Sequence, residues 1–75
     1  MSEQKFDVVL VKPSANKPAM VKVVLDLTGS GLRHSKDLVD NAPSVILGGV
    51  SQETANGAKS LLELAGAKVE IKPSK

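Results

Sequence analysis

The sequence predicts one α+β domain with the element order β-α-α-β-α-β, in which three helices lie on one face of a three-stranded, mainly antiparallel sheet. Three observations predict this fold. Segments near both ends have the composition or alternation of strands, three segments between them repeat apolar residues at helical spacing, and glycine, proline or asparagine stands at most junctions. The 75 residues suffice for one domain, 1–75, with a small core. Residues 1–4 and 73–75 are expected to fray.

The first strand is expected over residues 6–11, because FDVVLV is rich in β-branched and aromatic residues. A loop with two prolines separates it from a helix expected over residues 17–27. Asn16 can cap this helix, and Pro18 fits a first turn, where its missing N–H has no intrahelical partner. Gly29 is expected to end the helix in a left-handed conformation, and Gly31 to let the next helix approach closely or turn sharply.

The remaining elements follow from similar signals. A second helix is expected over residues 32–41 before Pro43, and a short strand over residues 44–47 before a turn at residues 48–49. Ser51 suits the N-cap of a third helix, which Gly66 would stop, and a last strand is expected over residues 68–71. The first strand is expected between the other two. The residues expected to face inward on the second and third helices are Leu32, Ser35, Leu38, Val39, Ala42, Ala55, Ala58, Leu61, Leu62 and Ala65.

The first helix carries two apolar stripes, where a helix of a small domain needs one. At about 100° per residue, apolar residues three, four and seven positions apart share a face. The stripe expected to be buried consists of Met20, Val23, Val24 and Leu27. The surplus stripe consists of Pro18, Val21 and Leu25, with Lys22 beside them. Such a surface favours a protein partner, with packing against a neighbouring loop or self-association as alternatives.

Composition excludes several function classes. A net charge of +2 without a basic run, and with Phe6 as the only aromatic residue, argues against direct nucleic-acid binding. The absence of cysteine excludes disulfides and thiolate metal sites. No apolar run approaches the roughly 18 residues of a membrane span, and the start MSEQKFDV lacks the pattern of a signal peptide, so a cytoplasmic protein is expected.

Nothing in the sequence predicts an enzyme, a metal site or a cofactor. The run of residues 29–31, Gly-Ser-Gly, lacks the third glycine, the lysine and the preceding strand of a phosphate loop, and is expected to join two helices. His34 and Ser35 are adjacent and therefore point to different faces of a helix, which does not suit a nucleophile and its base. His34 is expected to be solvated, and Asp37 and Asp40 are expected to form a solvated acidic face.

The chain resembles the C-terminal domain of the bacterial ribosomal stalk protein, large-subunit protein L seven/twelve, over residues 3–72. The runs that carry the resemblance are FDVVL, NKPAMVKVV, TGSGLRHSKDLVDNAP, GGVSQETA and LLELAGAKVEI. The most specific is T-G-x-G-L-x-x-x-K-x-L-V followed by A-P. The resemblance implies a domain carried on a mobile stalk. It also implies recruitment of translational GTPases, namely elongation factors Tu and G, initiation factor two and release factor three, and promotion of their GTP hydrolysis.

The resemblance implies a factor-binding surface on the first two helices. Carried over position by position, its residues are Lys17, Pro18, Val21, Lys22, Leu25, Gly31, Leu32, Arg33 and Lys36. The surplus apolar stripe of the first helix falls within this set. Its apolar residues would supply contact area, while the basic residues would steer an acidic partner, mainly by raising the association rate.

Some positions depart from the family pattern. Leu25 stands where the family usually carries a basic residue, so it is expected to enlarge the apolar patch, and Asp26 stands where a small residue is usual. The N-terminal dimerisation region and hinge of the family have no counterpart in these 75 residues, so attachment to the ribosome would need such a region. Two hypotheses remain: a stalk domain that binds translational GTPases, and a free-standing adaptor of the same fold that binds another protein or peptide.

Overall fold

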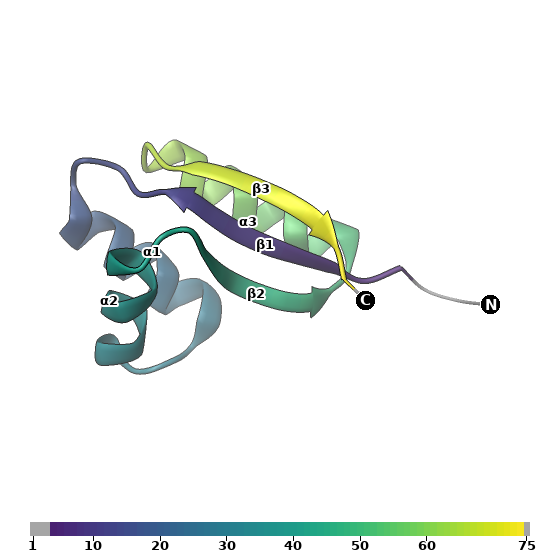
Figure 1. The fold of residues 1–75 in the computed structure, drawn as a ribbon, viewed down its shortest axis with the longest axis horizontal. Helices are drawn as coiled ribbons and strands as arrows, with labels where there is room; N and C mark the ends of the chain where they lie inside the picture. The colour runs from purple at the N-terminus through teal and green to yellow at the C-terminus, as the bar shows by residue number, and fades with distance from the viewer. Residues whose placement is uncertain (1–3, 75) are drawn as a thin grey trace.

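The computed structural model describes residues 4–74 and has the element order β-α-α-β-α-β (Figure 1). The elements are β1 (Phe6–Lys12), α1 (Lys17–Thr28), α2 (Leu32–Asp40), β2 (Ser44–Val50), α3 (Gln52–Leu64) and β3 (Lys68–Pro73). The predicted α+β class and element order are therefore confirmed.

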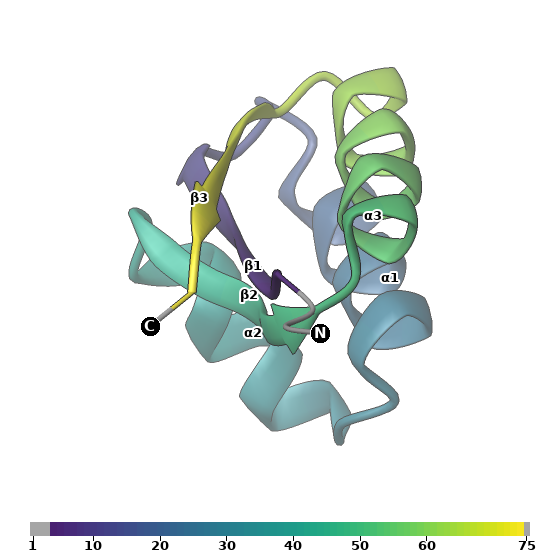
Figure 2. The same cartoon turned by 90° about the vertical axis from the view of Figure 1, so that its right-hand side faces the viewer.

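The sheet has the strand order β2-β1-β3, and β1 pairs antiparallel with both neighbours. The first strand thus lies in the middle, as predicted. Figure 2 shows α1 and α3 on the same side of this sheet. Helix α3 packs against β3 and β1, whereas α2 packs mainly against α1 and meets the sheet at β2. This arrangement leaves the outer surfaces of α1 and α2 next to each other at one end of the molecule.

The predicted helix caps are present. The Asn16 Oδ1 atom accepts a hydrogen bond from the Ala19 N–H at 3.4 Å, and the Ser51 Oγ atom accepts one from the Thr54 N–H at 3.2 Å. Gly29 ends α1 with φ of 67°, and its N–H donates to the Leu25 carbonyl at 2.9 Å. These bonds satisfy backbone groups that have no partner inside the helix, which is why the helix starts fall where the sequence predicts.

The predicted turn at residues 48–49 is wrong, because both glycines lie inside β2. Phe6 pairs with Val50 and Val8 pairs with Leu47, so β2 contributes one more residue than β1 over this stretch and forms a β-bulge. Gly49 has φ of 65°, and its N–H donates to the Asp7 Oδ1 atom at 3.0 Å. A Gly-Gly pair here bends a strand rather than ending it.

The last strand is also longer than predicted. β3 continues to Pro73, and the Ser74 N–H donates to the Lys5 carbonyl at 2.8 Å. The prediction that residues 73 and 74 fray is therefore wrong, because Pro73 pairs with Phe6 of β1 and Ser74 is hydrogen-bonded to Lys5. The same expectation for residues 1–3 and 75 lies outside the described residues.

The core lies between the sheet and the helices. Its buried apolar residues are Val8, Leu10, Met20, Val24, Val39, Ile46, Ala55, Ala58, Leu62, Ala67 and Val69. The inward prediction is wrong for Leu32, which is 65% exposed at the start of α2, and for Leu61, which is 51% exposed. Leu61 precedes Leu62 by one residue, about 100° around the helix, so only one of the two can point at the core.

Candidate protein-docking site

Helices α1 and α2 leave a groove of about 350 Å³ between them. Three apolar side chains, two lysines and one carboxylate line it. These residues, which we call the α1–α2 groove, are Lys17, Pro18, Val21, Leu32, Lys36 and Asp40.

Residue spacing explains why these side chains meet. Pro18 and Val21 are three positions apart on α1, so they share one face of the helix. Leu32, Lys36 and Asp40 are each four positions apart on α2 and form one row along it. The packing of α2 against α1 sets this row beside Pro18 and Val21.

The apolar residues of the groove differ in how much surface they offer a partner. Leu32 and Pro18 are exposed, whereas Val21 is half-buried and also packs against the core. Val21 therefore faces outward only in part. Leu25 is half-buried and does not line the groove, so its expected enlargement of the apolar patch stays a prediction. Leu32 and Pro18 are therefore the apolar side chains that the groove presents most openly to solvent.

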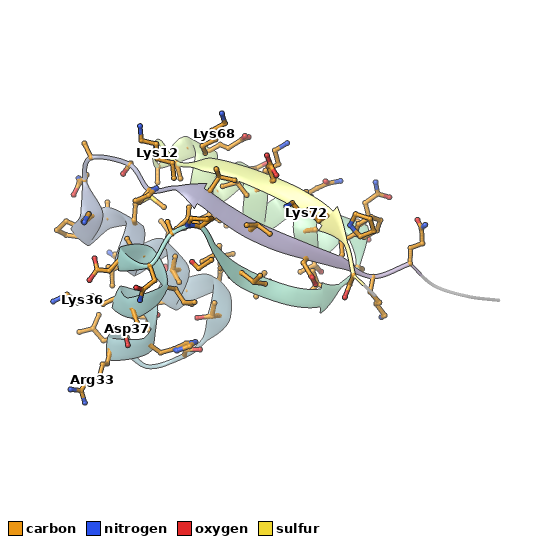
Figure 3. The ribbon with its side chains drawn as sticks, in the orientation of Figure 1. Lys12, Arg33, Lys36, Asp37, Lys68 and Lys72 are labelled. Atoms are coloured by element: carbon orange, nitrogen blue, oxygen red, sulfur yellow. The ribbon has the colours of Figure 1, made fainter. Side chains whose placement is uncertain are left out.

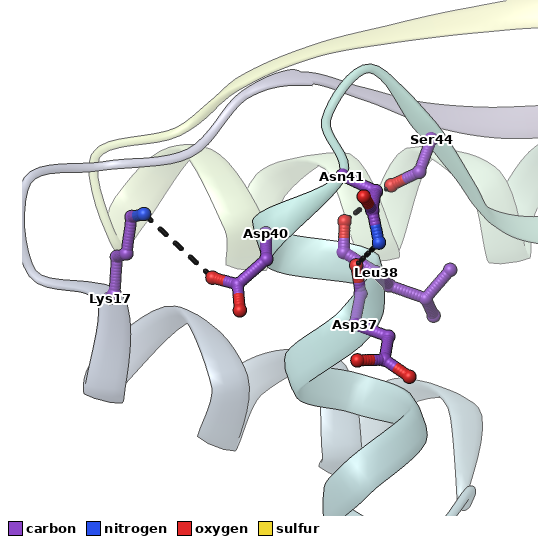
Figure 4. Close-up of polar contacts among 6 residues, drawn as sticks. All are labelled: Lys17, Asp37, Leu38, Asp40, Asn41 and Ser44. Atoms are coloured by element: carbon purple, nitrogen blue, oxygen red, sulfur yellow. Dashed lines mark hydrogen bonds and ion pairs between the residues drawn. The ribbon is translucent and has the colours of Figure 1, made fainter.

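Charge is distributed unevenly along the groove. The Lys17 Nζ atom lies 3.7 Å from the Asp40 Oδ1 atom, and this ion pair joins the start of α1 to the end of α2 (Figure 4). Lys36 takes part in no ion pair within the described part of the chain. Figure 3 shows its side chain extending outward from α2, as does that of Arg33. The groove therefore presents positive charge to a partner, mainly at Lys36.

The end of α2 that carries Asp40 is held by two further hydrogen bonds (Figure 4). The Asn41 Nδ2 atom donates to the Asp37 carbonyl at 2.8 Å, and the Ser44 Oγ atom donates to the Leu38 carbonyl at 2.6 Å. Both acceptors are backbone carbonyls near the C-terminal end of the helix, and the Asp37 carbonyl also accepts from the Asn41 backbone N–H at 3.0 Å. The two hydrogen bonds from Asn41 and Ser44 fix the direction in which the chain leaves α2.

The groove contains five of the nine residues that the family resemblance implies for factor binding. The other four are Lys22, Leu25, Gly31 and Arg33, which do not line it. Gly31 precedes α2 with φ of −65° and ψ of 160°, and a Cβ atom added there would meet nothing within 4 Å. The prediction that Gly31 permits a close helix approach is therefore wrong.

Asp40 lines the groove but is not among the nine residues that the resemblance implies. It is exposed, as the predicted solvated acidic face requires, but it also pairs with Lys17. The spacing of eight residues between Leu32 and Asp40 places both on one helix face, and this is the signal that could have found it.

The described residues contain no group of three or more histidine, cysteine, aspartate or glutamate side chains that could hold a metal ion. His34 is exposed, in agreement with its predicted place at the surface. None of the helices between residues 4 and 74 combines the length and apolar character needed to cross a membrane.

The chain is similar to ribosomal proteins over most of its length. Residues 6–72 match the family model of the ribosomal protein L7/L12 C-terminal domain. Large ribosomal subunit protein bL12 of Anoxybacillus flavithermus is 54% identical over 68 residues, covering 91% of this chain and 56% of that protein. The protein of the same name from Flavobacterium johnsoniae is 52% identical over 71 residues, covering 95% of this chain and 58% of that protein. The chain thus spans a little over half the length of these curated relatives. It belongs to the ribosomal protein L7/L12 C-terminal domain family.

Proposed function

We propose that this chain is a docking domain of the ribosomal stalk whose α1–α2 groove binds translational GTPases. The partners are elongation factors Tu and G, initiation factor two and release factor three, and binding supports their recruitment and GTP hydrolysis during translation. The observation that carries the proposal is the groove itself, where exposed Leu32 and Pro18 lie beside Lys17 and Lys36. The membership of the chain in a family of ribosomal proteins supports the choice of partner.

The composition of the groove suits a contact that forms and breaks quickly. Protein interfaces place apolar anchors at their centre and polar groups at the rim, and small interfaces are typical of transient encounters. Leu32 and Pro18 supply the apolar centre here, and Lys36 supplies rim charge. Because rim charges act mainly on the association rate, this groove favours rapid capture of an acidic partner over tight retention.

The four assigned residues outside the groove have a secondary place in this proposal. Lys22 and Arg33 are exposed, so they would add to the positive field around the groove without filling it. Leu25 and Gly31 flank the junction of the two helices, and we expect their replacement to affect binding less than replacement of Leu32. Attachment to the ribosome would depend on an N-terminal region of the kind that the family resemblance implies.

NMR titration tests the proposal. The ¹⁵N-labelled chain is titrated with elongation factor G and, separately, with elongation factor Tu, using serum albumin as an acidic control protein. We expect saturable shift changes at the amides of Lys17, Val21, Leu32 and Lys36, and none with albumin. Changes restricted to α3 and the sheet, or no binding of either factor at millimolar concentration, would refute the proposed function. Binding of an unrelated acidic protein with the same shift changes would favour the general adaptor instead.

A further inference from the structure

A second hollow, of about 510 Å³, lies where β1 ends and α1 begins. It is lined by residues 12–15 at the end of β1 and in the following loop, and by Lys17 at the start of α1. Gly66 from the turn after α3 and Lys68 at the start of β3 complete the lining. Neither the sequence pattern nor the proposed function assigns Lys12 or Lys68 a role. We call this feature the lysine hollow.

A close approach of two loops builds the lysine hollow. Gly66 has φ of 96°, and a Cβ atom added there would lie 3.1 Å from the Ser14 Cβ atom, so the turn after α3 lies directly against the β1–α1 loop. The Ser14 Oγ atom in turn donates to the Asn16 carbonyl at 3.3 Å. The hollow is therefore a packed feature of the fold and not a gap beside a free loop.

Positive charge dominates the lysine hollow. Lys12 and Lys68 pair directly across β1 and β3, an arrangement of like charges that disfavours a sheet. Figure 3 shows both side chains extending from the same end of the sheet. Within the described residues neither lysine is in an ion pair, and no carboxylate lines the hollow. An anionic partner would relieve the repulsion between the two ammonium groups.

Lys17 connects the lysine hollow to the α1–α2 groove, because it lines both. A partner in the groove would therefore pass over Lys17 to reach Lys12 and Lys68. We infer that the protein bound in the α1–α2 groove carries an acidic segment, with several neighbouring aspartates or glutamates, that continues into the lysine hollow. The inference rests on the proposed function, since it concerns the same partner.

The chemistry of the hollow favours a carboxylate-rich protein segment over a nucleic acid. Proteins that bind single strands stack bases on aromatic side chains, and no aromatic residue lines this hollow. Lysine ammonium groups act as flexible point charges on long stems, which can follow an acidic segment without fixed geometry. Long-range attraction of this kind raises the association rate and weakens as salt increases.

Titration of the ¹⁵N-labelled chain with hexaglutamate at low ionic strength tests the inference independently of any translation factor. We expect saturable shift changes at Lys12, Ser14, Gly66 and Lys68. The double variant Lys12→Gln/Lys68→Gln should lose them. The variant Lys59→Gln/Lys72→Gln, which removes the same charge from α3 and from the other end of β3, should retain them. The inference would be overturned if hexaglutamate shifted amides outside the lysine hollow instead, or if both double variants lost the shift changes equally.

Inorganic phosphate at matched ionic strength forms the second arm of this test. If phosphate binds saturably at a lower concentration than hexaglutamate and shifts the same amides, the hollow is a small-anion site. That result would overturn the inference that it holds an acidic protein segment.

In a third arm, the association rate with elongation factor G should fall by roughly 3- to 10-fold in Lys12→Gln/Lys68→Gln at low salt, with the dissociation rate unchanged. An unchanged association rate would overturn the inference. Failure of the parent chain to bind the factor, with hexaglutamate binding intact, would instead refute the proposed function.

Discussion

Lys17 and Asp40 join the first residue of α1 to the last residue of α2, with the Lys17 Nζ atom 3.7 Å from the Asp40 Oδ1 atom. The two side chains are 60% and 43% exposed, so the pair contributes only about 0–1 kcal/mol to stability. Its position matters more than its strength. Asp40 offsets the charge of the one lysine that lines both the α1–α2 groove and the lysine hollow.

Replacing Asp40 should strengthen the binding of acidic partners. Asp40→Asn removes the carboxylate that competes for Lys17, so we expect tighter binding of elongation factor G or hexaglutamate, measured by titration at low salt. The free energy of unfolding should change by less than about 1 kcal/mol. Asp37→Asn makes the same charge change on the same helix, outside the groove, and serves as the control. Equal effects of the two variants would show that Asp40 acts only through net charge.

Ser35→Ala should stabilise the domain. Ser35 is fully buried, and its Oγ atom has no hydrogen-bond partner among the described residues. A buried polar group without a partner costs about 1–3 kcal/mol, and alanine also favours a helix, so we expect the free energy of unfolding to rise by about 1 kcal/mol. Urea denaturation measures it.

Ser60→Ala separates the two contributions to this effect, because Ser60 is exposed on α3 and gains only helix propensity. If Ser35→Ala destabilises the domain while Ser60→Ala does not, the Ser35 hydroxyl makes a stabilising contact and the argument fails.

Gly57→Ala should also raise stability, through the backbone. Gly57 lies inside α3, is exposed, and has open space where a Cβ atom would be. Alanine at such a site typically gains about 0.5–1 kcal/mol over glycine. The thermal midpoint followed by circular dichroism should rise by several degrees, since about 1 kcal/mol shifts a domain of this size by roughly 4–8 °C. An unchanged or lower midpoint would contradict an exposed, regular helix at this position.

Gly66→Ala should have the opposite effect. Its φ of 96° disfavours any side chain, and the new Cβ atom would lie 3.1 Å from the Ser14 Cβ atom. We expect a loss of about 1–2 kcal/mol in the free energy of unfolding. Gly31→Ala should be close to neutral, because Gly31 has an ordinary backbone conformation and open space around it. A larger loss at Gly31 than at Gly66 would contradict the loop packing that forms the lysine hollow.

The sequence predicts the starts of α1 and α3 and the end of α1 well, because each of these boundaries has a local cause. Asn16 and Ser51 accept hydrogen bonds from the first turns of α1 and α3, and Gly29 adopts the left-handed conformation that ends α1. The extent of β2 depends instead on partners far away in sequence. Gly49 stays in the strand because it bonds to Asp7, 42 residues earlier, and no local pattern carries that information.

The candidate site is predictable only in outline. Helical spacing places Pro18 and Val21 on one face of α1, but it does not reveal how far α2 covers that face. The packing of the two helices makes Val21 half-buried, leaves Leu32 exposed, and brings Asp40 to Lys17. These outcomes depend on the crossing of α1 and α2, which is a tertiary property.

The most direct test of the proposed function compares Leu32→Asp with Leu64→Asp. Both leucines are strongly exposed, at 65% and 85%, so neither substitution should unfold the domain, and both make the same chemical change. Leu32 lies in the α1–α2 groove, whereas Leu64 lies on α3. With elongation factor G as the ligand, we expect Leu32→Asp to weaken binding at least about 10-fold, which corresponds to about 1.4 kcal/mol, and Leu64→Asp to leave it nearly unchanged. Equal binding of the two variants, or a loss confined to Leu64→Asp, would contradict docking in the α1–α2 groove.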